Sequence, residues 1–234
     1  MSQFTSTTLP CPGCGAGVPF DAVFSVNADR SPALRASILD ESFQRSTCPD
    51  CGTAFRLEPD FNYVDHGRAL WIAAKPLHRL PHWQEEEAHA LRLYERVYGA
   101  GGSPFMRNIG KTLRRRLTFG WAAVREKLLA DEHAIDDAAL EVCKSVVLRN
   151  SASAPVGLGA ELRLLRVTDA DLVLAWMRSQ DESTAQTLKA ARALYDQIVA
   201  DEEGVWAALR EELSAGPFVD LNRLLVVAAT ASDV

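Results

Sequence analysis

Apolar residues alternate with polar ones in short runs over much of the first eighty residues, a spacing typical of β-strands. This pattern predicts strands over residues 18–26, 54–57, 61–64 and 69–73. The last two strands flank the sequence Asp-His-Gly-Arg at 65–68, whose residue types favour a tight turn, so the pair is expected to form a hairpin.

Longer helical periodicities dominate the middle of the chain. A short helix is predicted over 32–39, with Ser31 at its N-cap and Pro32 at its first position, where these residue types are favoured. An amphipathic helix is predicted over 83–98, and the glycine-rich stretch at 99–102 ends it.

Three further helical stretches are predicted before a loop or linker that separates them from the last third of the chain. Ser103 and Pro104 begin the first stretch, and the other two are predicted over 121–130 and 136–148. Proline and glycine then recur over residues 151–160, which is typical of a loop or linker.

The last third of the chain begins with a second predicted hairpin. Its strands cover 162–167 and 172–177, joined by a polar turn. A long helix is predicted over 184–199, because Leu, Ala and Tyr recur at helical spacing, and a second helix over 205–213.

Composition narrows the class of protein without identifying an activity. The chain has 234 residues, of which 47% are hydrophobic and 24% charged, as in ordinary globular proteins. The sequence has neither an apolar run long enough to span a membrane nor a signal peptide, so we expect a cytoplasmic protein. The net charge of −6 argues against nucleic-acid binding by the whole chain.

The most specific chemical signal is the pentapeptide Cys-Pro-x-Cys-Gly, which occurs at 11–15 and again at 48–52. Proline stiffens such a turn, and glycine allows the backbone to curl beneath a bound ion. Two such steps supply four thiolates, the ligand set of a structural zinc site. The predicted ligands of a structural Zn²⁺ are Cys11, Cys14, Cys48 and Cys51.

Other uses of these thiols fit the sequence less well. A redox Cys-x-x-Cys step begins a helix, whereas Gly-Ala-Gly follows Cys14 and a predicted strand follows Cys51. Disulfides suit secreted chains, and a catalytic zinc keeps one coordination position open, which four cysteines would fill. The fifth cysteine, Cys143, lies in a helical pattern and is expected to be a buried apolar residue.

Together these patterns predict an α+β fold in three segments. Residues 1–81 would form a zinc-ribbon-like β module with a helical insertion, and 82–150 a helical part. Residues 160–234 would form a C-terminal part composed of a hairpin and helices.

The two cysteine motifs, together with Ser-Val-Asn at 25–27 and Tyr-Val-Asp-His at 63–66, resemble the CpXC domain family of bacteria. The likeness covers roughly the first half of the chain and extends more weakly through the helical stretch to Lys144. The resemblance implies a metal site and a bacterial source, and it implies no particular activity.

Residues 101–130 carry seven basic residues against one acidic residue, a net charge of +6. If this stretch is helical, four of the basic side chains share one face, which could contact phosphates or an acidic protein. The alternative is a solvated face whose cations pair with the acidic remainder of the chain. The residues of this basic stripe, within 107–116, are Arg107, Lys111, Arg114 and Arg115.

A second polar group lies near the predicted ribbon. A carboxylate beside a histidine could serve acid–base chemistry, whereas the same residue types also simply favour turns. The group comprises Asn27, Asp29, Arg30, Asp65 and His66.

The sequence therefore favours a zinc-stabilised, cytoplasmic interaction or regulatory protein whose partner is another protein, rather than an enzyme. Nucleic-acid binding through residues 107–116 is the alternative hypothesis. A hydrolase or transferase with a site near Asp65 and His66 is a weaker one. No cofactor other than Zn²⁺ is expected, and the oligomeric state stays open.

Overall fold

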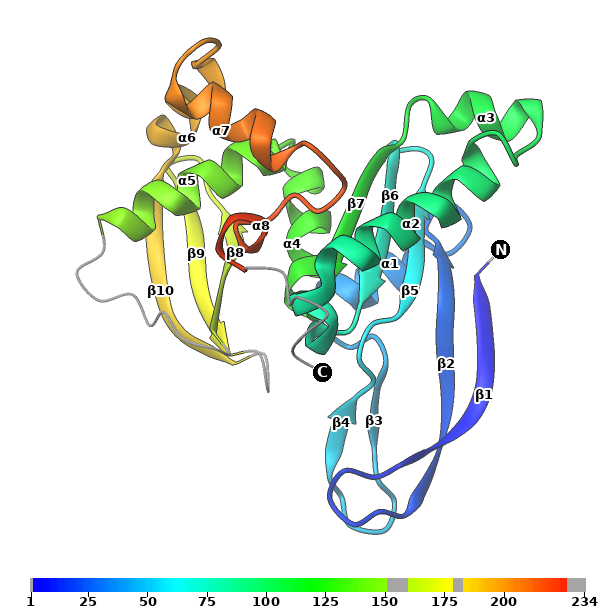
Figure 1. Cartoon of the computed structure of the whole chain (residues 1–234). Helices are drawn as coiled ribbons and strands as arrows, with labels where there is room; N and C mark the ends of the chain where they lie inside the picture. Colours follow the sequence, from blue (N-terminus) through cyan, green and yellow to red (C-terminus); the bar gives the residue numbers. More distant parts are fainter. Residues whose placement is uncertain (1, 151–159, 179–182, 227–234) are drawn as a thin grey trace, which may run out of the picture.

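The computed structural model describes residues 2–150, 160–178 and 183–226 and has the predicted α+β class (Figure 1). Most of the predicted 151–160 linker therefore lies outside the described residues. The strands are β1 (Gln3–Pro10), β2 (Gly17–Asn27), β3 (Arg45–Thr47), β4 (Ala54–Arg56), β5 (Phe61–Asp65), β6 (Leu70–Lys75), β7 (Arg114–Phe119), β8 (Ala160–Val167), β9 (Asp171–Arg178) and β10 (Thr184–Ala191). The helices are α1 (Pro32–Leu39), η1 (Leu77–His82), α2 (Trp83–Tyr98), α3 (Pro104–Gly110), α4 (Gly120–Glu132), α5 (Asp137–Arg149), α6 (Arg192–Ala200), α7 (Val205–Leu213) and α8 (Asn222–Leu225).

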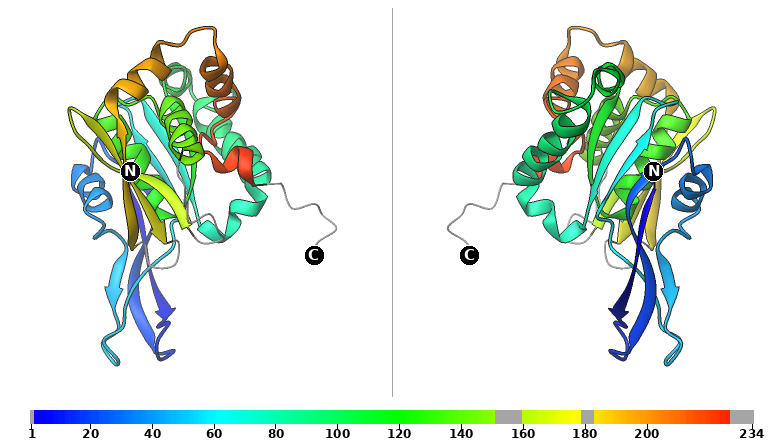
Figure 2. Two further views of the ribbon diagram at one scale, coloured as in Figure 1. Left: turned by 90° about the vertical axis from the view of Figure 1, so that its left-hand side faces the viewer. Right: turned by 90° about the vertical axis from the view of Figure 1, so that its right-hand side faces the viewer.

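A five-stranded mixed sheet in the order β1-β2-β5-β6-β7 organises the N-terminal half. Strand β6 is buried along its whole length, which its continuous apolar run Leu-Trp-Ile-Ala-Ala explains. Its alternate side chains enter two separate cores. Ile72 packs towards Trp121 of α4, whereas Trp71 packs against Tyr94 of α2. Helices α4 and α2 thus cover opposite faces of the sheet (Figures 1 and 2).

A second, three-stranded antiparallel sheet in the order β10-β9-β8 forms the C-terminal half. Leucines of β8 and β9 pack with α5 and α6 into one core, which also buries Tyr195 and Ile198. Helix α4 contacts strand β8 of this sheet as well as β6 and β7, and therefore lies between the two sheets (Figure 1).

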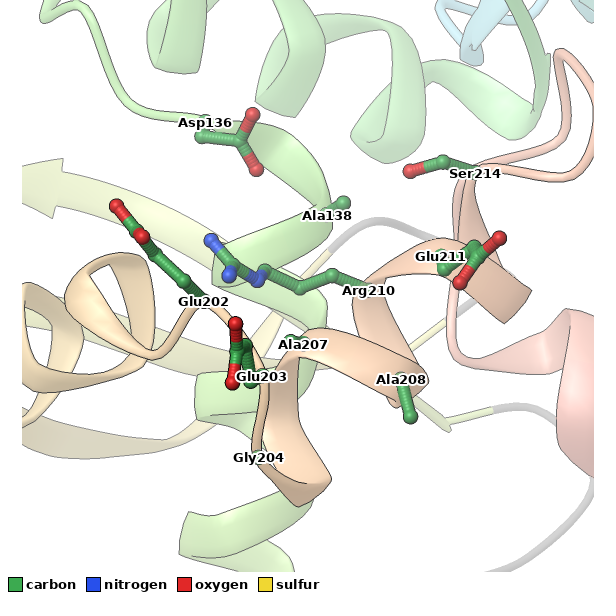
Figure 3. A pocket seen from close by; sticks show the side chains of 10 residues that line it. All are labelled: Asp136, Ala138, Glu202, Glu203, Gly204, Ala207, Ala208, Arg210, Glu211 and Ser214. Atoms are coloured by element: carbon green, nitrogen blue, oxygen red, sulfur yellow. The ribbon is translucent and has the colours of Figure 1, made fainter.

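A shallow polar depression of about 490 Å³ lies where the loop before α7 and α7 itself approach the start of α5 (Figure 3). Carboxylates of Asp136, Glu202 and Glu203 surround it, and Arg210 lies among them. The Arg210 guanidinium donates to the backbone carbonyls of Val199 and Asp201. Its charge therefore helps to hold the α6–α7 connection.

Most predicted elements are confirmed. The hairpins at 61–73 and 162–177 form as β5–β6 and β8–β9, and the helix at 83–98 is α2. Ser31 does occupy the N-cap of α1, but its side chain makes no capping hydrogen bond. Strand β1 was not predicted, since it is exposed along almost its whole length and lacks an apolar alternation.

The helical prediction around the basic stripe is wrong beyond residue 110. Helix α3 ends at Gly110, and Arg114–Phe119 form strand β7, which pairs in parallel with β6 over six residues. Pairing with the buried strand β6 outweighs local helical periodicity here. At the end of β7, Gly120 turns the chain into α4 with a φ of +75°, a conformation that favours glycine.

The helix predicted over 184–199 is also wrong in its first half. Residues Thr184–Ala191 form β10, which pairs antiparallel with β9, and the helix α6 begins only at Arg192. The residues of β10, including Leu188 and three alanines, favour a helix by intrinsic propensity, but here they form backbone hydrogen bonds with the open edge of β9.

None of the helices in the described ranges combines the length and the apolarity needed to cross a membrane.

Candidate metal centre

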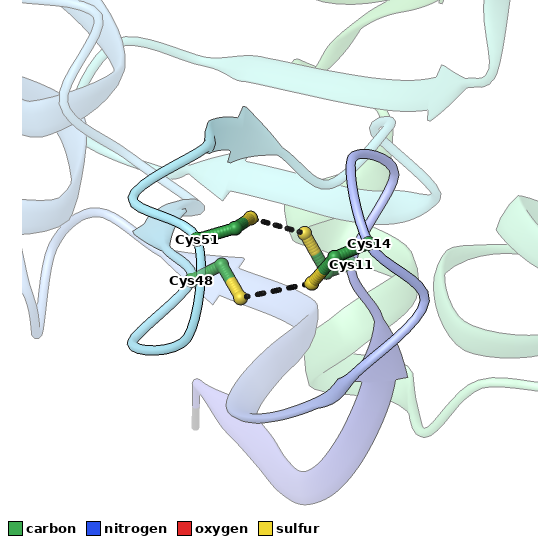
Figure 4. Close-up of side chains that lie close together, drawn as sticks. All are labelled: Cys11, Cys14, Cys48 and Cys51. Carbon is green, nitrogen blue, oxygen red and sulfur yellow. Dashed lines mark hydrogen bonds between the residues drawn. The ribbon is translucent and has the colours of Figure 1, made fainter.

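The four motif cysteines meet where the tips of two β-hairpins come together (Figures 1 and 4). The first motif connects β1 to β2, and the second connects β3 to β4. Both hairpins extend away from the helices that cover the five-stranded sheet, so the cysteines lie at the end of a projecting arm (Figure 1). We use the term arm for the outer parts of these two hairpins with their connecting turns.

The two turns have the same backbone structure. The N–H of Cys11 donates to Ala16 O, and the N–H of Cys48 donates to Thr53 O, at 2.8 and 2.9 Å. Gly15 and Gly52 donate back to the carbonyls of these two cysteines, each at 2.9 Å. Both glycines have positive φ, +77° and +72°, which explains why each motif ends in glycine.

Gly13 has a different role, because it lies against the other turn. A Cβ atom at this position would come within 2.4 Å of Thr53 Oγ1. The absence of a side chain at Gly13 therefore allows the two turns to approach closely enough for their sulfurs to meet.

The sulfur spacing matches the requirements of a single tetrahedral ion. Cys11 Sγ lies 3.6 Å from Cys51 Sγ, and Cys14 Sγ lies 3.7 Å from Cys48 Sγ (Figure 4). All four sulfurs lie within 4.8 Å of one another. An ion at about 2.3 Å from each sulfur needs sulfurs about 3.8 Å apart, whereas a disulfide needs about 2.05 Å. The four cysteines could therefore hold a metal ion.

Burial distinguishes the two cysteines of each motif. Cys11 and Cys48 are buried, packed with Val18 and Phe55, whereas Cys14 and Cys51 are exposed. The apolar packing holds one thiol of each pair in place. An ion at this centre would consequently lie close to the molecular surface, with one side covered by protein.

The thiols alone do not ionise alike. Hydrogen bonding by Thr53 lowers the pKa of Cys51 to about 6, and its Sγ lies 3.1 Å from Thr53 Oγ1. The Ala16 backbone N–H favours the Cys14 thiolate, but hydrogen bonding with Cys51 and desolvation outweigh it and raise the pKa of Cys14 to about 12. Four adjacent thiolates therefore require a compensating cation.

Comparison with protein families places this centre in a known context. The family model described as CpXC protein matches residues 9–144, which include both turns, the five-stranded sheet from β2 onwards and helices α1 to α4. The chain belongs to the CpXC family. Comparison with curated proteins and with solved structures finds no significant match to either.

In the second predicted polar group, His66 does pair with a carboxylate, but this carboxylate belongs to Asp29 and not to Asp65. His66 Nδ1 lies 2.8 Å from Asp29 Oδ2, and its Nε2 lies 3.3 Å from the hydroxyl of Tyr98. Asp29 also accepts the backbone N–H groups of His66 and Gly67, and despite some desolvation these hydrogen bonds lower the pKa of Asp29. These contacts fix the β5–β6 turn against the loop that precedes α1.

Asp65 and Asn27 point to other partners. Asp65 is buried, accepts a hydrogen bond from Tyr63 and from the Arg68 backbone, and lies 3.8 Å from the Arg68 side chain. Asn27 Oδ1 accepts the backbone N–H of Arg30. The expected approach of Asp65 to His66 is thus replaced by turn contacts, which account for this group.

The basic stripe does not form one face. Arg107 and Lys111 lie exposed at α3, whereas Arg114 and Arg115 belong to β7, whose side chains alternate between its two faces. Arg114 pairs with Asp131 of α4, and Arg115 lies over the ring of Tyr94 on α2 at 5.4 Å. The four residues would share one face only if helix α3 continued beyond Gly110.

A buried network of charged residues was missed in the sequence. It connects α4, α5 and β8 with the segment before α8, and its core pairs are Lys144 with Glu126 at 2.7 Å and with Glu141 at 2.8 Å. The network comprises Arg116, Glu126, Lys127, Asp137, Glu141, Lys144, Glu161, Arg163 and Asp220. Its sequence signal was the presence of Glu141 and Lys144, three residues apart, within an apolar helix.

Three of these carboxylates, from Glu126, Glu141 and Asp220, come close enough to suggest a second ion site. The Lys144 ammonium, however, already lies within hydrogen-bonding distance of two of them. Burial, with the nearby Asp220 and Glu126 carboxylates, raises the pKa of Glu141 to about 7 despite this lysine. The protein thus supplies its own cation here, in contrast to the cysteine centre.

Proposed function

We propose that the four cysteines bind one Zn²⁺ with a structural role, and that the chain acts as a zinc-stabilised interaction or regulatory protein in the cytoplasm. The observation that supports this proposal is the meeting of two equivalent turns whose sulfurs lie at tetrahedral spacing. Four thiolates fill the coordination sphere of zinc, which leaves no position for substrate or water.

The position of the centre explains what the ion would stabilise. Strands β3 and β4 have three residues each, too few for a hairpin to be stable by itself in water. The Zn²⁺ would join this short hairpin to the tip of the longer β1–β2 hairpin. Metal binding and folding of the arm are then one process.

Zinc is preferred over iron on chemical grounds, although a tetrahedral set of four sulfurs suits both. Sulfurs 3.6–3.7 Å apart fit a single ion rather than a larger iron–sulfur cluster. Zinc has no redox chemistry, as befits a structural role, and its thiolate ligands persist in a reducing compartment such as the cytoplasm.

The arm is the part of the molecule that best suits recognition of a partner protein. Its outer strand β1 pairs on one side with β2, while its other edge pairs with no strand of the described residues. An edge strand of this kind can pair with an extended segment of a partner. Phe4 and Phe24, which are exposed, add apolar surface on the same two strands, at the end of the hairpin away from its turn. The C-terminal sheet and helices would offer a further surface.

Metal analysis of the reduced, purified protein tests the first part of the proposal. We expect one zinc per chain, and a Cys14→Ser variant with much less. Cys143→Ala is the matched control, because it removes a thiol that is buried in the C-terminal core and should leave the zinc content unchanged. Iron in place of zinc, or well under half a zinc per chain, would contradict the assignment.

Site-specific photo-crosslinking in cells tests the interaction role. A photoreactive residue at Thr7, on the exposed strand β1, should give discrete crosslinked products, and one at Glu202, exposed before α7, should not give the same products. Loss of the Thr7 products in a Cys14→Ser background would connect them to the zinc centre. Identical products from both positions would count against the arm as the recognition surface.

The nucleic-acid hypothesis would now rest on Arg107 and Lys111, since Arg114 and Arg115 contact Asp131 and Tyr94. Its test is binding to duplex DNA and RNA at low salt, with affinity falling steeply as salt rises. We propose a role in binding rather than catalysis, because the polar group around His66 is accounted for by contacts within the β5–β6 turn.

A further inference from the structure

A second cavity, of about 500 Å³, lies away from the cysteine centre, where η1 meets α5, β8, β9 and the segment around α8. Its volume lies in the range of pockets that hold small organic molecules. Most of its wall is apolar. The larger apolar residues that line it are Leu77, Leu80, Leu148, Leu162, Trp176 and Leu225.

Apart from His78, the ionisable residues that line the cavity come from the buried network. They are Glu141, Glu161, Arg163 and Asp220. Of these, Glu141 is fully buried, and Arg163 and Asp220 are 3% and 4% exposed. An apolar cavity with a few buried charges from the protein is the usual construction of a ligand site.

The guanidinium of Arg163 is already engaged by carboxylates. Its Nε and Nη2 donate to Glu161, and its Nη1 donates to Glu126 and Asp220. The Lys144 ammonium behind it is likewise held by Glu126 and Glu141. To pair with Arg163 or Lys144, an anionic ligand would have to displace these hydrogen bonds. It would also be repelled by the three carboxylates of the cavity wall.

A cationic ligand meets the opposite situation. Each carboxylate oxygen can accept more than one hydrogen bond, so the acidic lining retains capacity for an N–H donor. The indole of Trp176 also lines the cavity, and an aromatic ring attracts a cation or packs against an apolar ligand body.

We propose that this cavity binds a small molecule with an apolar body and one protonated amine, the amine directed to the carboxylates of Glu141, Glu161 and Asp220. This site is independent of the zinc centre, since it is built from η1, α5 and the C-terminal sheet. It would give the protein a small-molecule input, separate from the arm proposed to contact a partner.

Three matched probes test the charge preference on the full, zinc-loaded chain: 4-phenylbutylamine, 4-phenylbutan-1-ol and 4-phenylbutyrate. They share one apolar body and differ only in the polar end. Isothermal titration calorimetry at pH 7.5 should show the amine binding at least tenfold more tightly than the other two. Equal affinities, a preference for the carboxylate, or no binding of the amine at millimolar concentration would overturn the proposal.

Variants locate the site. Leu148→Phe should weaken binding of the amine at least fivefold by occupying part of the cavity, whereas Leu209→Phe should leave it unchanged. Both leucines are partly buried against the same core, but only Leu148 lines the cavity. An equal effect of both variants would place the amine elsewhere.

Glu161→Gln tests the role of charge. It removes one lining carboxylate and loosens the hold on Arg163, so the tenfold preference for the amine over the carboxylate probe should shrink at least threefold. An unchanged preference would contradict the assigned direction of the amine. Should this variant fail to fold, the comparison of Leu148→Phe with Leu209→Phe still decides.

Discussion

The cysteine centre of the arm and the buried network around α4 both hold distant parts of the chain together through polar groups. They do so under opposite conditions. The arm brings four thiols together at a partly exposed tip, where an external cation would be needed to hold all four as thiolates, whereas the network places four cations of the protein among its own buried carboxylates. The arm should therefore respond to metal supply and the network to mutation and pH.

Loss of the metal should produce the largest effect, and only in the arm. Structural zinc contributes on the order of 10–16 kcal/mol in small zinc modules, comparable to the stability of a whole domain. Chelation of the zinc should lower the hydrogen-exchange protection of β3, β4 and the two turns at least about a hundredfold. Amides of β6 and α4 should retain their protection, because their cores are formed by other residues. Unchanged exchange in the arm would mean that no metal ion stabilises it.

Removal of one cation from the buried network should produce the next largest effect. Lys144→Met leaves Glu126 and Glu141 buried without their ammonium partner, which should lower the free energy of unfolding by about 3–5 kcal/mol. Lys189→Met is the control, since its pair with Asp171 is exposed and should contribute less than about 1 kcal/mol. Urea denaturation measures both. An equal loss of unfolding free energy in the two variants would mean that a buried ion pair of the network contributes no more to stability than an exposed one.

The pH dependence of stability should reflect Glu141. Its pKa is about 7 in the folded chain, against a usual 4.5, so the folded state holds the proton more tightly than the unfolded state. The stabilisation from this group is complete below about pH 4.5 and is lost as pH rises through 7. We expect the free energy of unfolding to fall by about 1–3 kcal/mol between pH 5.5 and 8.

The Glu141→Gln variant provides the control for this dependence. Without the titrating carboxyl, its stability should change little over the same pH interval, even if its absolute stability is lower. Glu126 and Asp220, whose pKa values are lowered by Lys144 and Arg163, titrate well below this interval and should not contribute. A wild-type protein whose stability rises with pH would contradict the assignment.

The smallest expected effect concerns the glycines of the two turns. A Cβ atom at Gly52 would meet nothing within 4 Å, so Gly52→Ala costs only the strain of a positive φ, about 1 kcal/mol. Zinc affinity, measured by competition with a chelator, should fall about fivefold. Gly67 lies outside both cysteine turns, so Gly67→Ala should leave the zinc affinity unchanged.

The difference between the two regions also explains what could be predicted from the sequence. Each cysteine turn is encoded by five consecutive residues, so both turns and the four cysteines that could hold a metal ion can be recognised from the sequence alone. The network joins residues such as Glu126 and Asp220, which only the tertiary structure brings together. No local pattern marks Arg163 as buried.

The same reasoning accounts for the errors in secondary structure. The hairpin β5–β6 was predicted because its strands and turn are adjacent in the sequence. Strand β7 was mistaken for a helix because its partner β6 lies about forty residues earlier and covers it only in the folded chain. Strand β10 was mistaken because its helix-favouring residues complete an edge of the β8–β9 hairpin.

X-ray absorption spectroscopy at the zinc edge would examine the proposed metal centre itself, on reduced protein with its metal content measured in parallel. We expect one zinc per chain with four sulfur neighbours at about 2.3 Å. A first shell containing nitrogen or oxygen, or a preparation that carries iron or no metal at this centre, would contradict it.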